Sequence, residues 1–213
     1  MSLITMKKPT IIYFASSNKD KLKEIKSILF AQKIKTISIK SAPKGFKVKE
    51  NGKSFLENAF KKAKTLSKKL KVIAFSDDSG IEVFALNKKP GIKSSRFFRG
   101  GKGMFEIVEK VKNKKNKKCC FTCAIVATNS KGKIIFKTQK SWHGKVAKKP
   151  MGKNGFGYDP IFIIPKLNKT SAQISSKLKN KLSHRAMAVK ALGKWLRTVG
   201  ADLYQMSAQA YKG

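Results

Sequence analysis

Short apolar runs alternate with segments of helical periodicity along most of this sequence, and this alternation constrains the fold more than any other feature. Residues 10–15 are a run of β-branched and aromatic side chains, which is typical of a buried strand. Leu22, Ile25 and Leu29 follow at helical spacing, so the sequence predicts an amphipathic helix over 19–30. Strands that alternate with helices in this way indicate an α/β fold.

The rest of the chain continues the pattern. Apolar residues that recur every three or four positions predict further helices over 53–70, 104–111 and 182–197. Short apolar runs predict strands at 37–39, 72–75, 81–86 and 161–164. Two longer runs, 119–128 and 133–142, flank turn residues at 129–132 and predict a β-hairpin. Because a hairpin joins antiparallel strands, the sheet should be mixed.

The length and composition fit one compact unit. A chain of 213 residues, 41% of them apolar, can bury a sizeable core, so we expect a single domain over 1–213. No run approaches the ~18 apolar residues of a membrane helix, and residues 1–15 lack the form of a signal peptide. Cys119, Cys120 and Cys123 lie in one apolar run, which favours reduced, buried thiols over a zinc site. These features predict a cytoplasmic protein.

The net charge is unusual for a compact protein. Forty-nine basic residues against eleven acidic ones give +38, a balance typical of nucleic-acid-binding proteins. Only four of the basic residues are Arg, however, and Arg makes the bidentate contacts on which dedicated nucleic-acid surfaces depend. Lysines occur in nearly every segment, which favours a solvated surface. Binding of nucleic acid through that surface stays an alternative, which a gel shift across salt concentrations would test.

The few carboxylates are clustered. Between positions 50 and 82 the chain carries Glu50, Glu57, Asp77, Asp78 and Glu82. Asp77 and Asp78 follow an apolar strand, and Gly80 permits a sharp turn after them. Adjacent carboxylates in such a place are costly unless they are paired or bind a cation, and oxygen ligands suit Mg²⁺. The sequence therefore predicts a magnesium site at an acidic turn, with Glu50 and Glu57 as candidate further ligands.

Three other motifs suit a nucleotide. Residues 16–21, Ser-Ser-Asn-Lys-Asp-Lys, stand where a strand meets a helix, and the unpaired N–H groups of a helix N-terminus attract phosphate. Phe156 and Tyr158 lie among glycines, so an aromatic face can stack on a base. Lys179 and the pair His184-Arg185 add hydrogen-bond donors that suit the carbonyl oxygens of a purine. Each motif alone also fits a helix cap, a packed turn or a solvated surface.

Together these motifs resemble the inosine triphosphate pyrophosphatase family. They occur in the family's order and span about residues 10–197. The resemblance rests on Ser17-Asn18-Lys19-Asp20-Lys21, Glu57-Asn58-Ala59, Ser76-Asp77-Asp78-Ser79-Gly80-Ile81, Pro90-Gly91-Ile92-Lys93-Ser94-Ser95-Arg96-Phe97, Gly155-Phe156-Gly157-Tyr158-Asp159-Pro160-Ile161-Phe162 and Ser183-His184-Arg185.

The resemblance implies a fold and a reaction. The fold is an elongated mixed β-sheet with flanking helices and two lobes around a central cleft, usually in a homodimer. The reaction is Mg²⁺-dependent hydrolysis of inosine and xanthosine triphosphates, or their deoxy forms, to the monophosphate and pyrophosphate, which cleanses the nucleotide pool. A related pyrophosphatase acting on modified pyrimidine nucleotides is an alternative, although the His184-Arg185 pair favours a purine.

The resemblance also implies site residues. By position, Asp78 is the general base and, with Glu50, a metal ligand. The implied substrate-binding residues are Ser16, Ser17, Asn18, Lys19, Asp20, Lys21, Ser79, Phe156, Gly157, Tyr158, Asp159, Lys179, His184 and Arg185.

Overall fold

The fold is built on one mixed sheet. The computed structural model describes residues 10–34 and 37–208. Its strands are β1 Thr10–Phe14, β2 Ile37–Ser41, β3 Ala74–Val83, β4 Lys89–Pro90, β5 Lys118–Thr128, β6 Ile134–Val146, β7 Phe162–Ile164 and β8 Lys169–Thr170. They lie in the order β2-β1-β3-β5-β6-β7-β8, and β4 pairs with one end of β3. β1 is parallel to β2 and β3, whereas the other pairs are antiparallel, so the predicted mixed sheet is confirmed.

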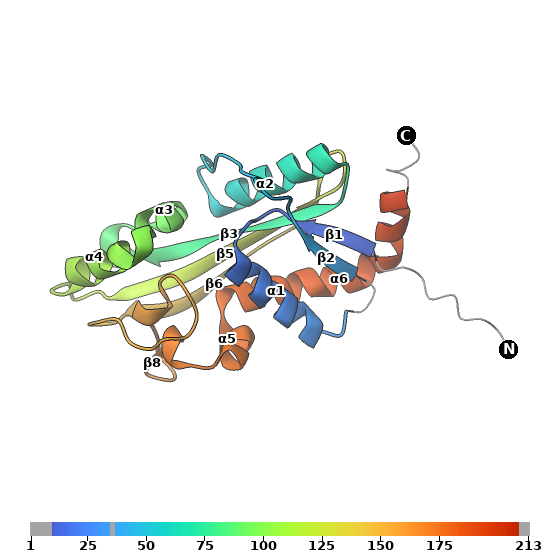
Figure 1. The fold of residues 1–213 in the computed structure, drawn as a ribbon. Helices are drawn as coiled ribbons and strands as arrows, with labels where there is room; N and C mark the ends of the chain where they lie inside the picture. Colours follow the sequence, from blue (N-terminus) through green and yellow to red (C-terminus); the bar gives the residue numbers. More distant parts are fainter. Residues whose placement is uncertain (1–9, 35–36, 209–213) are drawn as a thin grey trace.

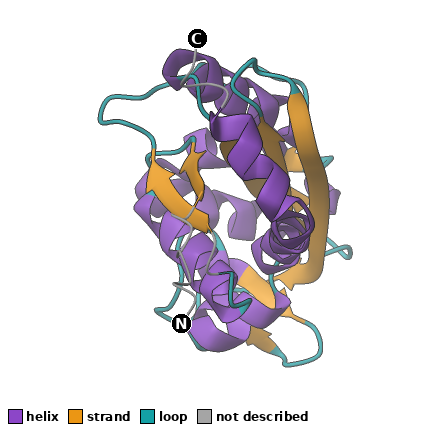
Figure 2. Cartoon of the chain, turned by 90° about the vertical axis from the view of Figure 1, so that its right-hand side faces the viewer, coloured by secondary structure: helices purple, strands orange, loops and turns teal. Residues whose placement is uncertain are grey.

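Helices pack on both sides of this sheet (Figure 1). They are α1 Lys19–Ala31, α2 Phe55–Leu70, α3 Ser94–Phe98, α4 Lys102–Val111, α5 Ser176–Leu182 and α6 His184–Ala208, and short 3₁₀ turns connect several elements. Figure 2 gives the same arrangement turned by 90°. The sequence pattern missed α3 and α5, because one or two turns are too short to show helical periodicity. Within the described residues, no helix is both long and apolar enough to cross a membrane.

Apolar clusters fill both faces of the sheet. One cluster packs α1 and α6 against β1, β3 and the later residues of β5. A second lies on the same face towards the other end, between α4 and the strands β5, β6 and β7. A third packs α2 on the opposite face. The three cysteines are buried and free, as predicted, and burial raises the pKa of the Cys123 thiol to about 12.

The acidic segment does not form the predicted turn. Residues 74–83 are one continuous strand, paired with β5 from Ala74 to Val83, so the prediction of a strand end at residue 75 and a turn at 76–80 is wrong. These residue types favour a turn, but that local preference is overridden, because β5 pairs with the backbone of the segment and neighbouring elements supply partners for its side chains. Gly80 has another role, because a Cβ there would lie 2.4 Å from both Gly91 O and Ser94 Oγ. The glycine lets the start of α3 pack directly onto the strand.

Replacing Gly80 with Ala should lower the free energy of unfolding by about 1–3 kcal/mol, the usual cost of overpacking. The Gly91 carbonyl is part of the backbone, so relief requires the segment that leads into α3 to shift. Urea denaturation of both proteins measures the difference. An unchanged midpoint with an unchanged slope would contradict the close approach.

One edge of β3 is left open, and this opening positions the site. β1 pairs with β3 only at Ala74 and Phe75, and β4 pairs with it only at Glu82 and Val83. Between these contacts the edge has no strand partner in the part of the chain that the structure describes. Side chains alternate along a strand, so Asp77 lies on the α1 and α6 face and Asp78 lies on the α2 face. A cleft at this edge can therefore reach both faces.

Candidate functional site

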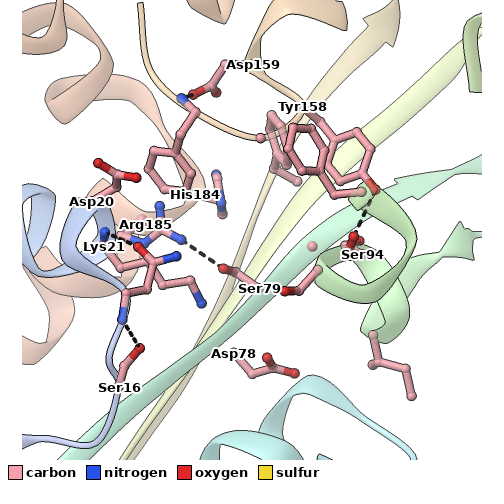
Figure 3. A pocket seen from close by; sticks show the side chains of 18 of the residues that line it. Ser16, Asp20, Lys21, Asp78, Ser79, Ser94, Tyr158, Asp159, His184 and Arg185 are labelled. Atoms are coloured by element: carbon pink, nitrogen blue, oxygen red, sulfur yellow. Dashed lines mark hydrogen bonds between the residues drawn. The ribbon is translucent and has the colours of Figure 1, made fainter. Parts of the chain in front are cut away.

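A cleft of about 530 Å³ opens at the uncovered edge of β3. The start of α1, the Gly-rich loop after β6, the start of α3, α5 and the start of α6 complete its walls (Figure 3). All the site residues that the resemblance implied line it except Lys19, the exposed first residue of α1; Asp77 and Glu57, the other candidate carboxylates of the predicted magnesium site, do not line it. Lining residues that the sequence reading did not select are Lys62, Gly80, Ile92, Ser94, Ser95, Phe98 and Phe121.

The start of α1 forms one corner of the cleft. Asn18 caps the helix, because its Oδ1 accepts a hydrogen bond from the Lys21 amide at 2.9 Å. Ser16 Oγ in turn accepts from the Asn18 amide at 3.2 Å. These contacts fix the loop between β1 and α1, so the helix begins at the cleft with its positive end towards it. Residues 16–21 therefore lie where a strand meets the N-terminus of a helix, which is the geometry that the prediction of phosphate binding required.

Asp77 lies fully buried beneath this corner and holds two cations. Lys21 Nζ lies 3.1 Å from its Oδ1, and Arg185 Nε and Nη2 each lie 3.3 Å from its Oδ2. Burial opposes ionisation of Asp77, but Lys21 and Arg185 outweigh it and hold the pKa of this carboxyl well below its usual range. Asp77 therefore stays ionised and anchors two positive side chains at the cleft.

The ion pairs continue from Arg185 to the Gly-rich loop. Arg185 contacts Glu24 of α1, and Glu24 Oε1 lies 2.8 Å from Lys179 Nζ. Lys179 also contacts Asp159, whose Oδ2 accepts a hydrogen bond from the Phe156 amide at 2.8 Å. Burial disfavours the Glu24 carboxylate, but Arg185 and Lys179 lower its pKa below the usual value. Sequence reasoning missed Glu24; its position one turn after Lys21 on α1 was the available signal.

The aromatic residues of the loop take different positions. The Phe156 ring lies beneath two cations, with Lys179 Nζ 4.8 Å and the Arg185 guanidinium carbon 5.4 Å from its centre. Tyr158 is buried and anchored, because its hydroxyl donates to Ser94 O at 2.8 Å. Phe156 is the half-buried ring of the two, so it is the one with a face available to a flat ligand.

Asp78 occupies the other side of β3 (Figure 3). Its Oδ2 accepts a hydrogen bond from Asn58 Nδ2 at 3.1 Å, and its Oδ1 lies 3.3 Å from Lys62 Nζ. Burial raises the pKa of Asp78, the Lys62 and Lys21 ammonium groups oppose the rise, and Glu50 adds to it. A carboxylate with a raised pKa is better suited than an ordinary one to accept a proton at neutral pH.

Glu50 and Asp78 converge on one positive charge. Lys62 Nζ lies 2.9 Å from Glu50 Oε1 as well as 3.3 Å from Asp78 Oδ1. Two carboxylates meeting at a single point form the donor set that Mg²⁺ takes when phosphates and water supply its other ligands. No cluster of three or more metal-binding side chains occurs among the described residues, so an all-protein cage is not formed there. The chemistry of these two residues thus fits a magnesium ion shared with a substrate.

The other candidate carboxylate, Glu57, is used elsewhere. Its Oε2 accepts a hydrogen bond from the Lys53 amide at 2.8 Å, and its Oε1 pairs with Lys61 at 3.1 Å. It therefore supports the start of α2 and does not line the cleft. Asn58, which follows it, is fully buried and ties the Glu50 loop to the strand: its Oδ1 accepts from the Gly52 amide at 2.7 Å, while its Nδ2 donates to Asp78.

A mixed α/β sheet whose cleft has a cationic wall opposite paired carboxylates is the form expected of an enzyme that works on phosphoanhydrides. Comparison with known protein families agrees with this class. Residues 12–195 match the Ham1 family, and the chain belongs to that family.

Individual relatives support the assignment. The chain is 40% identical to the dITP/XTP pyrophosphatase of Clostridium perfringens over 190 residues, which cover 84% of this chain and 93% of the relative. The structure is similar to a HAM1 protein from Coxiella burnetii, with a TM-score of 0.79, 31% identity and coverage of 89% of this chain and 99% of the other. It is equally similar to the Staphylococcus aureus Ham1 protein, with a TM-score of 0.78, 34% identity and coverage of 89% and 99%. The predicted family and fold are confirmed.

Proposed function

We propose that this protein hydrolyses inosine and xanthosine triphosphates, and their deoxy forms, to the monophosphate and pyrophosphate. The observation that carries the proposal is the convergence of Glu50 and Asp78 on one point, opposite the Lys21 and Arg185 cations, in a chain related to dITP/XTP pyrophosphatases. The carboxylates suit a metal and a water molecule, and the cations suit the phosphates.

The phosphate end of the substrate lies, in this proposal, at the start of α1. Backbone N–H groups after Ser16 and the Lys21 ammonium would bind phosphate oxygens, and Ser79 would contribute its hydroxyl. Ser79 Oγ already accepts from Arg185 Nη2 at 2.8 Å, so it is fixed towards this wall. Because Asp77 offsets the charges of Lys21 and Arg185, the corner is ordered before a ligand binds.

The catalytic end lies at Asp78. Mg²⁺ held by Glu50 and Asp78 would neutralise charge that develops on the phosphates and on the departing pyrophosphate. Asp78 would accept the proton of the attacking water. Lys62 keeps the two carboxylates together and is itself placed to contact a phosphate oxygen.

The base end lies between Phe156 and His184. Phe156 would stack on the base, while His184 and Arg185 would face the oxygen at the purine 6-position. Adenosine carries an amine at that position, so its binding would place this hydrogen-bond donor against a buried donor of the protein. Such a mismatch supports a preference for inosine and xanthosine over adenosine. The purine-specific names of the relatives weigh against the pyrimidine alternative.

Three finer properties belong to the same proposal. We infer one two-lobed domain over 1–213, a homodimer, and a location in the cytoplasm. Sedimentation velocity tests the dimer, which would give about twice the monomer mass of 23.7 kDa. The lysine excess keeps nucleic-acid binding as a separate possibility, for which we expect at most weak binding that disappears as salt rises.

The decisive experiment measures pyrophosphate release from inosine, xanthosine, adenosine and guanosine triphosphates, with Mg²⁺ and with excess EDTA. We expect kcat/KM for inosine and xanthosine triphosphates to exceed that for adenosine triphosphate by roughly 10²-fold or more. EDTA should remove the activity. Equal rates on all four nucleotides, or release of orthophosphate alone, would refute the proposal.

A further inference from the structure

A cluster of aromatic rings leads from the sheet to the base end of the cleft. The Phe121 ring lies 4.5 Å from the Phe162 ring, Trp142 lies 4.7 Å from Phe162, and the Phe121 and Trp142 rings are 6.5 Å apart. Phe121 then stacks on the His184 imidazole, with ring centres 4.8 Å apart and an angle of 16° between the planes. Strand pairing produces this cluster, because Phe121 of β5 is directly opposite Trp142 of β6. The last ring in the series, His184, lines the cleft.

Among the residues that the structure describes, the contact that holds the His184 imidazole is this stack, and none of them makes a hydrogen bond with its Nδ1. The residue is 4% exposed, and its Nδ1 is buried with no hydrogen-bond partner among the described residues. A buried polar ring normally has such partners, so an unpartnered one at a cleft points to a ligand that supplies them. The near-parallel face of Phe121 is the contact that sets the plane in which the ring nitrogens lie.

Phe121 also belongs to the cleft itself. It is buried to 6% exposure, yet it is one of the lining residues. Its ring therefore has two contacts that matter, one with the core rings behind it and one with the imidazole in front. A leucine would fill most of its volume but would not offer a flat face.

We propose that Phe121 is a positioning residue for base recognition, which orients the His184 imidazole towards the base of the bound nucleotide. The inference rests on the proposed function, since it adds a specificity-determining residue to that site. Phe121 acts through His184; a direct catalytic role is not part of the proposal.

The surroundings of His184 keep the ring uncharged. Burial lowers its pKa well below the usual value, and the neighbouring cations Arg185 of α6, Lys179 of α5 and Lys21 of α1 act in the same direction. Asp77 of β3 opposes them but is outweighed. A neutral imidazole that presents one donor and one acceptor depends on the orientation of its ring, whereas an imidazolium donates from both nitrogens.

The test compares two leucine variants. Phe121→Leu removes the face under His184, and Phe136→Leu removes a ring stacked 5.1 Å from Trp195 of the same helix, α6, in a different apolar cluster. We expect Phe121→Leu to lower kcat/KM for inosine triphosphate about tenfold, the worth of one good hydrogen bond, and to leave that for adenosine triphosphate nearly unchanged. Most of the loss should be in KM. Phe136→Leu should lower thermal stability without changing the ratio between the two substrates.

An NMR measurement tests the same inference without a nucleotide. The chain has only two histidines, His143 and His184, so the imidazole signals are readily assigned with a His184→Gln reference. In Phe121→Leu the His184 ring signals should lose the ring-current shift that a stacked phenyl group produces, while the His143 signals stay in place. In Phe136→Leu both sets should be unchanged.

Each outcome has one interpretation. If Phe121→Leu and Phe136→Leu lose stability alike and neither alters the substrate ratio beyond about twofold, Phe121 is packing only and the inference is wrong. If the His184 signals do not move in Phe121→Leu, the stack is not what orients the ring, and the inference is again wrong. Failure of the proposed function would be seen separately, in a wild-type protein that does not prefer inosine triphosphate.

Discussion

Asp78→Asn should lower kcat for inosine triphosphate by roughly 10³-fold or more while the protein stays folded. General-base catalysis alone contributes about 10²–10⁴-fold, and an amide neither accepts the proton nor neutralises a metal ion. The substitution nearly preserves the shape of the side chain. Lys62 keeps Glu50 as a partner 2.9 Å away, so no buried cation is left unpaired.

The same variant should be at least as stable as the wild type. Because burial raises the pKa of Asp78 in the folded state, its ionisation opposes folding at neutral pH. Replacement by a neutral amide removes that penalty. Thermal unfolding at pH 7 measures the stability, and Glu109→Gln, at an exposed carboxylate on α4, is a control that should keep full activity. Near-normal turnover in Asp78→Asn would remove Asp78 from the mechanism.

Asp77→Asn, the same substitution one residue earlier, should instead destabilise the protein by about 3–5 kcal/mol. Asp77 pairs with Lys21 at 3.1 Å and with Arg185 at 3.3 Å, and its removal leaves the charge of the Lys21 ammonium without a carboxylate at that contact. The cost of breaking a buried pair comes mostly from the charge that is left behind. Urea denaturation of both asparagine variants at pH 7 gives the comparison. If the two variants have equal midpoints, the contrast between the two faces of β3 is wrong.

The effect of Asp77 should also depend on pH. Its pKa is held well below the usual value in the folded protein, so its contribution is complete above the unfolded pKa of ~3.9. The contribution is lost progressively as pH falls from the unfolded pKa towards the lower pKa of the folded protein. The difference in stability between wild type and Asp77→Asn should therefore be large at pH 7 and smaller at pH 3.5. A difference that stays constant over this range would show that the carboxylate charge is not responsible.

Much of the architecture could be predicted from local patterns. The apolar period over 19–30 and 53–70 gave α1 and α2 to within two residues at their ends, because burial of one helix face imposes that period on the sequence. The runs at 119–128 and 133–142 predicted the β5–β6 pair, because burial of a strand also imposes a pattern of apolar residues on the sequence. Motif order identified the family, and nearly every residue carried over by position lines the cleft.

Local patterns failed where distant segments supply the partners. Ser-Asp-Asp-Ser-Gly has the composition of a turn, yet β5 pairs with the whole segment and the start of α3 packs on Gly80. Lys62 and Glu24 were not predicted as site residues, because a local pattern does not show which partner a charged residue on a helix will meet. Each is held by a partner from another element: Lys62 by Asp78, Glu24 by Arg185.

The sequence by itself determined most of the elements, the family and most of the side chains that meet at the cleft, because periodicity and motif order are properties of the chain alone. Only the tertiary structure decided what the two adjacent aspartates do. Strand alternation turns Asp77 towards Lys21 and Arg185 and Asp78 towards Lys62 and Asn58. The pKa of a carboxyl depends on its burial and on the charges within a few ångströms, and those neighbours come from positions far apart in the chain.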